Sequence, residues 1–193
     1  IMVQVVKDCI GTKGARVSHN ISLPGRLLVL MPSVNYIGIS KKISDESVRR
    51  RLYIKMLKIK LKGMGFIVRT AAFKAKFKDI KEEAQKLTEC WKDICRCYKN
   101  AKIYDVVHFE DDLICRTFRD IYSDEIKEII INDKSILDKI LKCAFVKIKA
   151  KTIIFPRDRD MFHDYNISAQ VDGMLSNKVW LDNGAYLIID KTE

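Results

Sequence analysis

The sequence predicts a mixed fold, α+β passing into α/β, in which a small domain of strands and one long helix comes first. Residues 1–40 read mainly as short strand-like runs, and a long helical stripe follows further along the chain. Strands then alternate with helices up to a C-terminal hairpin, which is typical of an α/β layer. We place a domain boundary between Lys102 and Glu110.

Length and composition restrict the class of protein. A chain of 193 residues, 48% of them hydrophobic, is long enough for one or two domains with real cores and too apolar for a disordered chain. No apolar stretch reaches the roughly 18 to 20 residues that a membrane-spanning helix needs. The first residues, "IMVQVV", lack a basic leader and read as the middle of a strand, so we expect no signal peptide and a longer parent protein.

The formal charge of +11 favours a polyanionic partner, nucleic acid ahead of an anionic membrane surface. The alternative is that many of the lysines are only solvated. The six cysteines form no C-x-x-C pair, and the spacing of Cys90, Cys95 and Cys97 does not keep them on one helix face. We therefore expect no zinc site, and thiols in a reducing cytosol rather than disulfides.

The N-terminal elements are marked by strand-like composition and by turn residues. A polar loop, "GTKGARVSHN", separates the first two of three predicted strands, which span residues 1–8, 23–32 and 35–40. A helix follows, capped by Ser44 or Asp45, with Val48, Leu52 and Met56 on one face. Glycines at 63 and 65 end this helix, and the strand "FIVRT" comes next.

The clearest periodic signal predicts a long helix. Apolar residues are spaced alternately three and four apart at Phe77, Ile80, Ala84, Leu87, Trp91, Ile94 and Tyr98. A coiled-coil dimer is one interpretation. The flanking positions show no ordered charge pattern, so packing of the stripe on a sheet of the same chain is favoured.

The C-terminal half alternates between helical and strand patterns. The strand at 126–133 is apolar enough to predict burial on both faces. The helix after it carries Ile136, Leu137, Ile140 and Leu141 on one side. The other elements are helices at 111–123 and 167–177, a strand at 146–155, and a hairpin at 178–190 with Asp182-Asn183-Gly184 at its turn.

The stretch "GFIVRTAAF" raises the main functional question. Arg69 and Thr70 follow a buried strand, shortly before a long helical pattern. A guanidinium fork, a hydroxyl and backbone N–H groups together suit a phosphate. The alternative is a solvated arginine beside a threonine that caps a helix.

Other candidate chemistry is weaker. "DRDMFHD" joins three carboxylates to His163, but no metal-ligand spacing accompanies it, and Arg157 and Arg159 can neutralise the acids. Neither a G-x-S-x-G elbow nor a P-loop is present, and no catalytic set is complete. In "KGAR", Lys13 and Arg16 flank a glycine in a loop between strands, which suits either contact with single-stranded nucleic acid or a solvated hairpin tip.

Five blocks, in order, carry a resemblance that covers nearly the whole chain: "GTKGARVSHNISLPGRLLVLMP", "GISKKI", "GMGFIVRTAA", "FRDIYSDEIKEIIIND" and "VWLDNGAYLIIDKTE". Together they resemble the bacterial ribonuclease E/G family. The resemblance implies three parts: the end of an OB-type RNA-binding domain (1–20), a 5′-sensor domain (21–105) and a partial RNase H-like domain (106–193).

The resemblance implies a cytoplasmic, magnesium-dependent endoribonuclease that matures ribosomal RNA and turns over messenger RNA. Its partner is single-stranded RNA with a 5′-monophosphate, and its parent protein is expected to be a homo-oligomer. The family's metal-binding aspartates lie in a D-x-N motif just beyond "LIIDKTE". We therefore expect no catalytic or metal-binding residue in this chain, which by itself should not cut RNA. The alternative is a non-catalytic RNA-binding protein of the same family.

The resemblance also assigns site residues. It places Arg69 and Thr70 on the 5′-phosphate, with the loop backbone around Gly25 and Val29. It places Lys13 near the RNA strand, and the pair Lys41 and Lys42 where relatives often carry arginines. Phe73 and Lys74 stand where relatives usually have smaller or acidic residues, a difference that would alter the rim of the phosphate pocket.

Overall fold

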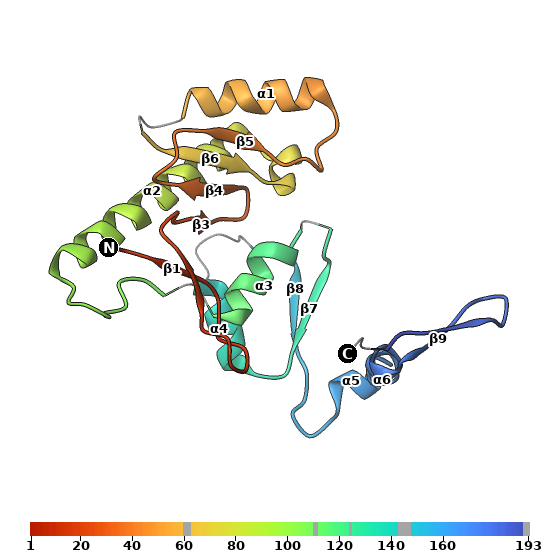
Figure 1. Cartoon of the computed structure of the whole chain (residues 1–193). Helices are drawn as coiled ribbons and strands as arrows, with labels where there is room; N and C mark the ends of the chain where they lie inside the picture. Colours follow the sequence, from red (N-terminus) through yellow and green to blue (C-terminus); the bar gives the residue numbers. More distant parts are fainter. Residues whose placement is uncertain (60–62, 110–111, 124, 143–147, 191–193) are drawn as a thin grey trace. The chain divides into compact units, whose positions relative to one another are not determined.

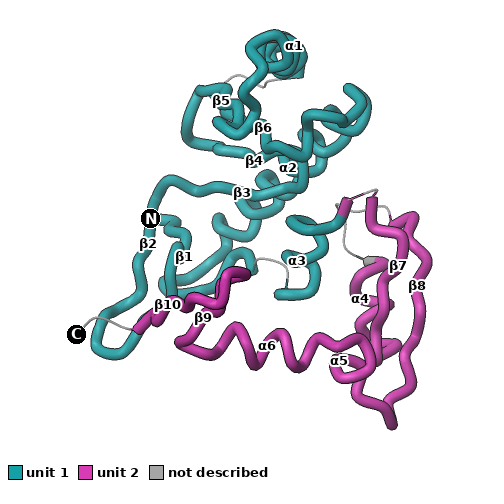
Figure 2. The backbone as a smooth tube through the Cα atoms, turned by 90° about the vertical axis from the view of Figure 1, so that its right-hand side faces the viewer, with its two compact units in different colours: residues 1–122, 143–147 teal, residues 123–142, 148–193 magenta. Residues whose placement is uncertain are grey.

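The computed structural model describes residues 1–59, 63–109, 112–123, 125–142 and 148–190 (Figure 1). The chain divides into two compact units, residues 1–122 with 143–147, and residues 123–142 with 148–193 (Figure 2). Both units combine helices with strands, so the predicted mixed fold is confirmed. The three-part domain division, with its boundary between Lys102 and Glu110, stays a prediction. No described helix is both long and apolar enough to cross a lipid bilayer.

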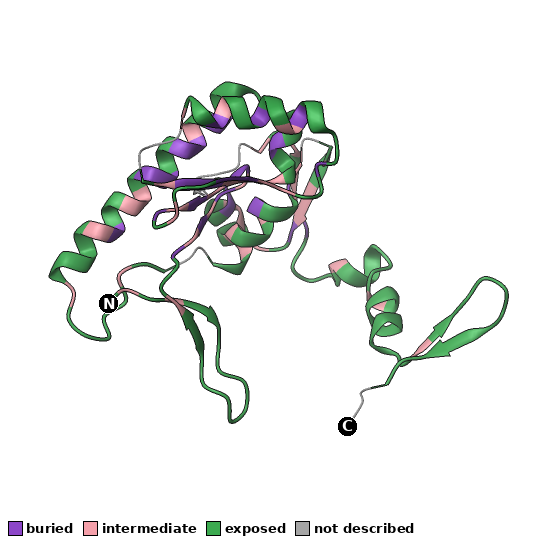
Figure 3. Ribbon diagram, turned by 45° about the horizontal axis from the view of Figure 1, so that its top comes forward, coloured by how far each residue is buried: buried purple, intermediate pink, exposed green. Residues whose placement is uncertain are grey.

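Unit 1 begins with an exposed hairpin. Strands β1 (Gln4–Lys7) and β2 (Arg16–Ser18) pair antiparallel, and Ile10 and Lys13 exchange two backbone hydrogen bonds in the loop between them. Most residues of the hairpin are exposed (Figure 3). The Gln4 side chain ties it to the following segment, because it both donates to the Ser22 carbonyl and accepts from the Ser22 N–H at 2.9 Å.

A four-stranded sheet follows, in the order β3-β4-β6-β5. Its strands are β3 (Leu23–Pro24), β4 (Leu28–Met31), β5 (Ile37–Ile39) and β6 (Gly65–Val68). Strand β6 runs antiparallel to β4 and parallel to β5. The prediction of one continuous strand over 23–32 is wrong, since Gly25 begins a turn in which its N–H donates to the Leu28 carbonyl at 2.7 Å.

Two helices complete the core of unit 1 (Figure 1). Helix α1 (Glu46–Leu57) contacts β5, and the Asp45 side chain caps it by accepting from the N–H groups of Ser47 and Val48. A short 3-10 helix, η1 (Thr70–Lys74), links β6 to helix α2 (Phe77–Asn100), which contacts β4. The stripe residues Ile80, Ala84, Leu87 and Ile94 are buried in the core of this chain, as predicted. Helix α3 (Leu113–Ile121) is the last described helix of unit 1.

Unit 2 contains a β-α-β element and a hairpin. Strands β7 (Glu128–Ile131) and β8 (Lys151–Ile154) pair in parallel, and helix α4 (Lys134–Lys142) lies between them in the chain. Helices α5 (Met161–Asp164) and α6 (Ser168–Leu175) follow, then the antiparallel pair β9 (Lys178–Trp180) and β10 (Tyr186–Ile188). Gly184 takes a φ of 83° in the turn of the predicted hairpin.

Three predictions about burial and pairing in the chain are wrong. Only Ile131 of β7 is buried, because the described neighbours cover Ile129 and Ile130 only in part. Leu141 is 64% exposed, since neighbouring helix positions differ by roughly 100° and Ile140 takes the inward one. Cys115 is part of a disulfide, whereas Cys9, Cys90, Cys95 and Cys97 are not disulfide-bonded.

Candidate nucleic-acid interface

Three segments that are distant in sequence meet at one edge of the four-stranded sheet. Because β5 and β6 are parallel, their carboxyl ends meet, and the Ser40 N–H donates to the Val68 carbonyl at 2.8 Å. Because β4 is antiparallel to β6, the turn before β4 reaches the same edge, and the Arg69 N–H donates to the Leu27 carbonyl at 2.8 Å. We call the three segments, Gly25–Leu28, Ser40–Lys42 and Arg69–Thr70, the cationic edge.

The turn Gly25–Leu28 is held in place by hydrogen bonds to a buried carboxylate. Glu83 of α2 is only 6% exposed, and its Oε1 accepts from the backbone N–H groups of Leu27 at 2.7 Å and Leu28 at 2.9 Å. The space beside Gly25 is filled by the same carboxylate, so a side chain at this position would collide with it. Glycine is therefore required here for close approach rather than for an unusual backbone angle.

Arg69 is anchored to this turn by its side chain as well as its backbone. Its Nη1 donates to the Gly25 carbonyl at 2.6 Å and to Asp120 Oδ1 at 2.7 Å. The side chain is 31% exposed, so part of the guanidinium faces solvent. Arg69 is thus not a freely solvated surface residue, and its side chain contacts Gly25, which the family resemblance assigns to the same phosphate. The phosphate role of both residues stays a prediction.

The other two predicted phosphate ligands lie beside this pair. Thr70 is exposed directly after Arg69, and its hydroxyl makes no hydrogen bond to the described residues. Val29 follows the turn on β4 and faces Ile67 across the ladder. The sequence placed the first N–H groups of a helix shortly after Thr70. In the structure, Thr70 is the first residue of η1, and helix α2 begins only at Phe77.

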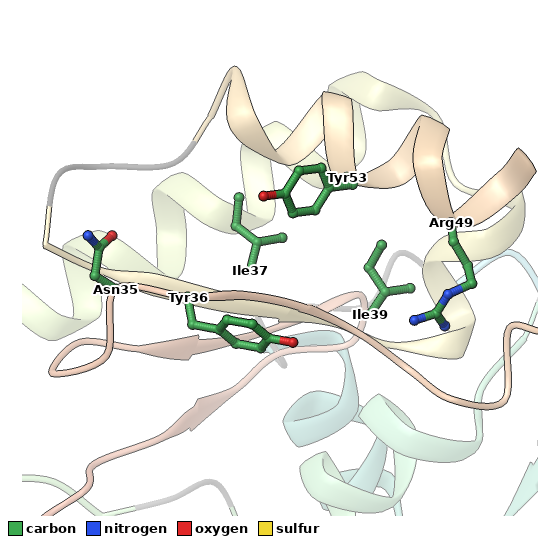
Figure 4. A pocket seen from close by; sticks show the side chains of 6 residues that line it. All are labelled: Asn35, Tyr36, Ile37, Ile39, Arg49 and Tyr53. Atoms are coloured by element: carbon green, nitrogen blue, oxygen red, sulfur yellow. The ribbon is translucent and has the colours of Figure 1, made fainter. Parts of the chain in front are cut away.

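Lys41 and Lys42 lie exposed in a turn that α1 holds in place. Arg49 Nη1 donates to the carbonyls of Ser40 at 3.0 Å and Ile43 at 3.1 Å, which are the two ends of this turn. Arg49 also lines a hollow of about 360 Å³ between α1 and β5 (Figure 4). Its other lining residues are Asn35, Tyr36, Ile37, Ile39 and Tyr53. Among these described lining residues, Arg49 alone is cationic.

Lys13 is not part of the cationic edge. It lies in the exposed loop between β1 and β2, where its backbone pairs with that of Ile10. A role in RNA binding for Lys13 stays a prediction, and it would concern a different surface element from the one around Arg69.

The structure adds charged residues that the sequence analysis missed. Arg119 of α3 is 6% exposed and its Nη1 donates to the Pro24 carbonyl at 3.2 Å, while the neighbouring Asp120 binds Arg69. Arg26 lies over the ring of Tyr122, with 5.9 Å from Cζ to the ring centroid. Glu83 had a usable signal, since it follows Ile80 by three positions and precedes Leu87 by four, which places a carboxylate on the apolar stripe.

Two of the three carboxylates in the acidic stretch of unit 2, and Asp133 near it, have local partners. Asp160 caps α5, Asp164 pairs with Arg159, and Asp133 pairs with Arg157 at 3.0 Å. Among the residues that the structure describes, no group of three or more histidine, cysteine, aspartate or glutamate side chains could hold a metal ion. The cationic edge, by contrast, presents hydrogen-bond donors and positive charge, which suit an anion.

The buried Glu83 should make the stability of unit 1 depend on pH. Burial raises the pKa of Glu83 above its usual 4.5, although the N–H groups of Leu28 and Leu27 and the charges of Arg26 and Arg69 oppose the rise. The folded state then binds the proton more tightly than the unfolded state. The resulting stabilisation is complete below pH 4.5 and is lost as the pH rises through the higher, folded-state pKa.

Glu83→Gln tests this dependence, because glutamine keeps an acceptor oxygen and does not titrate. We expect the wild type to lose stability relative to Glu83→Gln as the pH rises above 4.5. Urea unfolding of both proteins at a series of pH values measures the difference, in which the contributions of all other carboxylates cancel. Parallel stability curves for the two proteins would contradict a raised pKa.

Comparison with known proteins gives a family. The model of the "Ribonuclease E/G family" matches residues 22–193. The chain is 32% identical over 196 residues to ribonuclease G of Salmonella typhimurium, and 33% identical over 199 residues to ribonuclease E of Nostoc sp.. Both matches cover 100% of this chain, but only 40% of the first relative and 29% of the second.

Both of these relatives are ribonucleases by name. The chain belongs to the ribonuclease E/G family, and the resemblance seen in its sequence blocks is confirmed. It spans less than half the length of the relatives named here.

Proposed function

We propose that this chain is the RNA-binding, 5′-monophosphate-sensing part of a magnesium-dependent endoribonuclease that acts on single-stranded RNA. The parent protein would mature ribosomal RNA and turn over messenger RNA in the cytoplasm as a homo-oligomer. The observation that supports the sensing role is the cationic edge, where a glycine turn, Arg69 with Thr70, and the Lys41-Lys42 pair converge.

The chemistry of a 5′-monophosphate matches the groups at this edge. A terminal phosphate carries nearly two negative charges at pH 7 and three strong acceptor oxygens. Arg69 supplies a planar set of donors, the exposed Thr70 hydroxyl supplies one more, and Lys41 and Lys42 supply mobile positive charge. A 5′-hydroxyl end is uncharged and offers one acceptor oxygen in place of three, so the edge should favour the phosphorylated end.

We place the metal-dependent step on residues outside this chain, as the family resemblance implies. A magnesium ion needs several oxygen ligands at one place, and the described residues do not gather such a set. When bound in the parent protein, magnesium would supply the charge stabilisation for phosphodiester cleavage. The residues of this chain would bind and orient the RNA end.

Arg69→Lys is the direct test of the sensing role. Lysine keeps the positive charge but not the planar fork, and a charge-assisted hydrogen bond contributes about 1.5 to 3 kcal/mol. We expect the preference for 5′-monophosphorylated over 5′-hydroxyl RNA to fall about ten-fold or more. Fluorescence anisotropy with two oligonucleotides, identical except for the 5′ end and labelled at the 3′ end, measures the ratio of the two Kd values.

Arg50→Lys provides a matched control, since Arg50 lies exposed on α1 and makes no hydrogen bond or ion pair with the described residues. It should leave the ratio unchanged, and circular dichroism should show that both variants are folded. A wild-type protein that binds both RNAs equally, or an Arg69→Lys protein that keeps the full preference, would refute the phosphate role of this edge.

A further inference from the structure

The guanidinium of Arg69 is divided into an occupied side and an open side. Its Nη1 carries two hydrogens, and the structure gives it two acceptors, the Gly25 carbonyl at 2.6 Å and Asp120 Oδ1 at 2.7 Å. Among the described residues, Nε and Nη2 have no partner, and neither is a buried unsatisfied atom. The Nε–Nη2 edge, which is the pair of donors that binds two oxygens side by side, is therefore open to solvent.

The carboxylate that holds Nη1 is itself firmly placed. Asp120 lies in the last turn of α3, and the neighbouring Arg119 contacts both its oxygens, at 3.4 Å to Oδ1 and 3.5 Å to Oδ2. Arg119 is buried and donates to the Pro24 carbonyl at 3.2 Å, one residue before Gly25. The end of α3 is thus joined to the same turn that accepts from Arg69.

Asp120 stays ionised in this setting. Partial burial raises the pKa of Asp120, but the hydrogen bonds and charges of Arg119 and Arg69 outweigh it and lower the pKa below 3.8. At neutral pH its carboxylate is a charged acceptor, which holds a guanidinium more strongly than a neutral one.

We propose that Asp120 is a positioning residue for 5′-phosphate recognition, because it holds Nη1 of Arg69 and so presents the Nε–Nη2 edge to the RNA end. This inference rests on the proposed function and names a residue that was not among the predicted site residues. The carboxylate and the phosphate would bind different sides of one guanidinium. Asp120 therefore need not be displaced when RNA binds.

A positioning role for Asp120 and simple electrostatics predict opposite effects when the Asp120 carboxylate is removed. A carboxylate close to a phosphate repels it, so removal of the charge alone would strengthen binding of the phosphorylated end. If Asp120 acts by orienting Arg69, its removal weakens that binding, because a freely rotating fork no longer forms two aligned hydrogen bonds. The sign of the change therefore separates a positioning residue from a competitor for Arg69.

The experiment measures the Kd ratio for 5′-hydroxyl over 5′-monophosphorylated RNA in Asp120→Asn and Asp120→Ala. Asparagine keeps a neutral acceptor and alanine keeps none, so we expect losses of about three-fold and about ten-fold in the ratio, in that order. Asp93→Asn, which removes the carboxylate of a different aspartate–arginine pair on α2, is the control and should change nothing. In an Arg69→Lys background, Asp120→Asn should have little further effect, since it acts through Arg69.

The outcomes separate the inference from the proposed function. One outcome has three parts: the wild type prefers the phosphorylated end, Arg69→Lys removes this preference, and both Asp120 variants keep or increase it. This outcome overturns only the positioning role of Asp120. Equal weakening of binding to both RNAs would show a merely structural role and would also overturn it. If Asp120→Ala does not fold, two results decide the question: the Kd ratio of Asp120→Asn, and whether Asp120→Asn still changes this ratio in the Arg69→Lys background. A wild type without any preference refutes the sensing function itself.

Discussion

Replacing Glu83 with alanine is expected to lower the free energy of unfolding of unit 1 by about 2 to 4 kcal/mol. The substitution leaves two backbone N–H groups, those of Leu27 and Leu28, without their acceptor in a buried place. It also leaves a cavity where the carboxylate lay against Gly25. Each buried donor without a partner costs about 1 to 3 kcal/mol, which sets the size of the effect.

The measurement is urea unfolding followed by the fluorescence of Trp91, which packs against the core of unit 1. A Trp180→Phe background makes this signal specific, because the only other tryptophan lies in unit 2. Glu82→Ala is the matched control. Glu82 is the partly exposed neighbour, and its carboxylate pairs with Lys78 at 3.8 Å, so its loss should cost less than about 0.5 kcal/mol. Similar midpoints for the two variants would show that Glu83 does not hold the turn.

Glu83→Ala should also reduce the preference for 5′-phosphorylated RNA. The Gly25 carbonyl that accepts from Arg69 belongs to the turn that Glu83 fixes, so a looser turn gives Arg69 a less defined position. Glu83 thus connects the stability of the core to the geometry of the cationic edge, through the backbone rather than through contact with RNA.

Local sequence patterns predicted those parts of the fold that local interactions determine. The spacing of apolar residues along α2 identified its buried face, and Asp45 was one of two predicted caps of α1. The turn with Gly184 was predicted from three residues. Each of these features depends on neighbours within a few positions, so one sequence contains the needed information. By contrast, how deeply β7 is buried depends on distant segments, and that prediction was wrong.

The candidate site was predicted only in part for the same reason. Arg69 was identified by its place after an apolar strand, and Gly25 through the family resemblance. The residues that hold them were missed, because their partners lie far away in sequence: Glu83 binds the turn across 55 and 56 positions, and Arg119 binds Pro24 across 95. Only the fold shows that two helices, α2 and α3, send charged side chains to one glycine turn.

The split of the predicted strand 23–32 into β3 and β4 has a local and a distant origin. Pro24-Gly25 is a common turn dipeptide, but the apolar run around it favoured a continuous strand. The turn forms because Gly25 can lie against a buried carboxylate that no local pattern pairs with it. This dependence of Gly25 on Glu83 gives a second prediction.

Gly25→Ala is expected to destabilise unit 1 by about 2 to 3 kcal/mol and to reduce the 5′-phosphate preference several-fold. The added Cβ would overlap with Glu83 Oε1 and would lie 3.1 Å from the Leu28 carbonyl oxygen. A glutamate at the surface would swing aside at little cost. Here the carboxylate is buried and accepts from two N–H groups, so moving it breaks both hydrogen bonds and shifts the carbonyl that holds Arg69.

Gly14→Ala is the control, because nothing lies within 4 Å of a Cβ placed there, and it should leave both unfolding and the 5′-phosphate preference nearly unchanged. The decisive comparison is the double variant Gly25→Ala with Glu83→Ala. Once the carboxylate is gone, the new methyl group lies mainly against the cavity. The double variant should therefore lose clearly less stability than the sum of the losses of the two single variants. The urea midpoints of the four proteins of this cycle measure the coupling. Full additivity would mean that Gly25 is required for a reason other than the close approach of Glu83, and the link between the core and the cationic edge would then have to run through another residue.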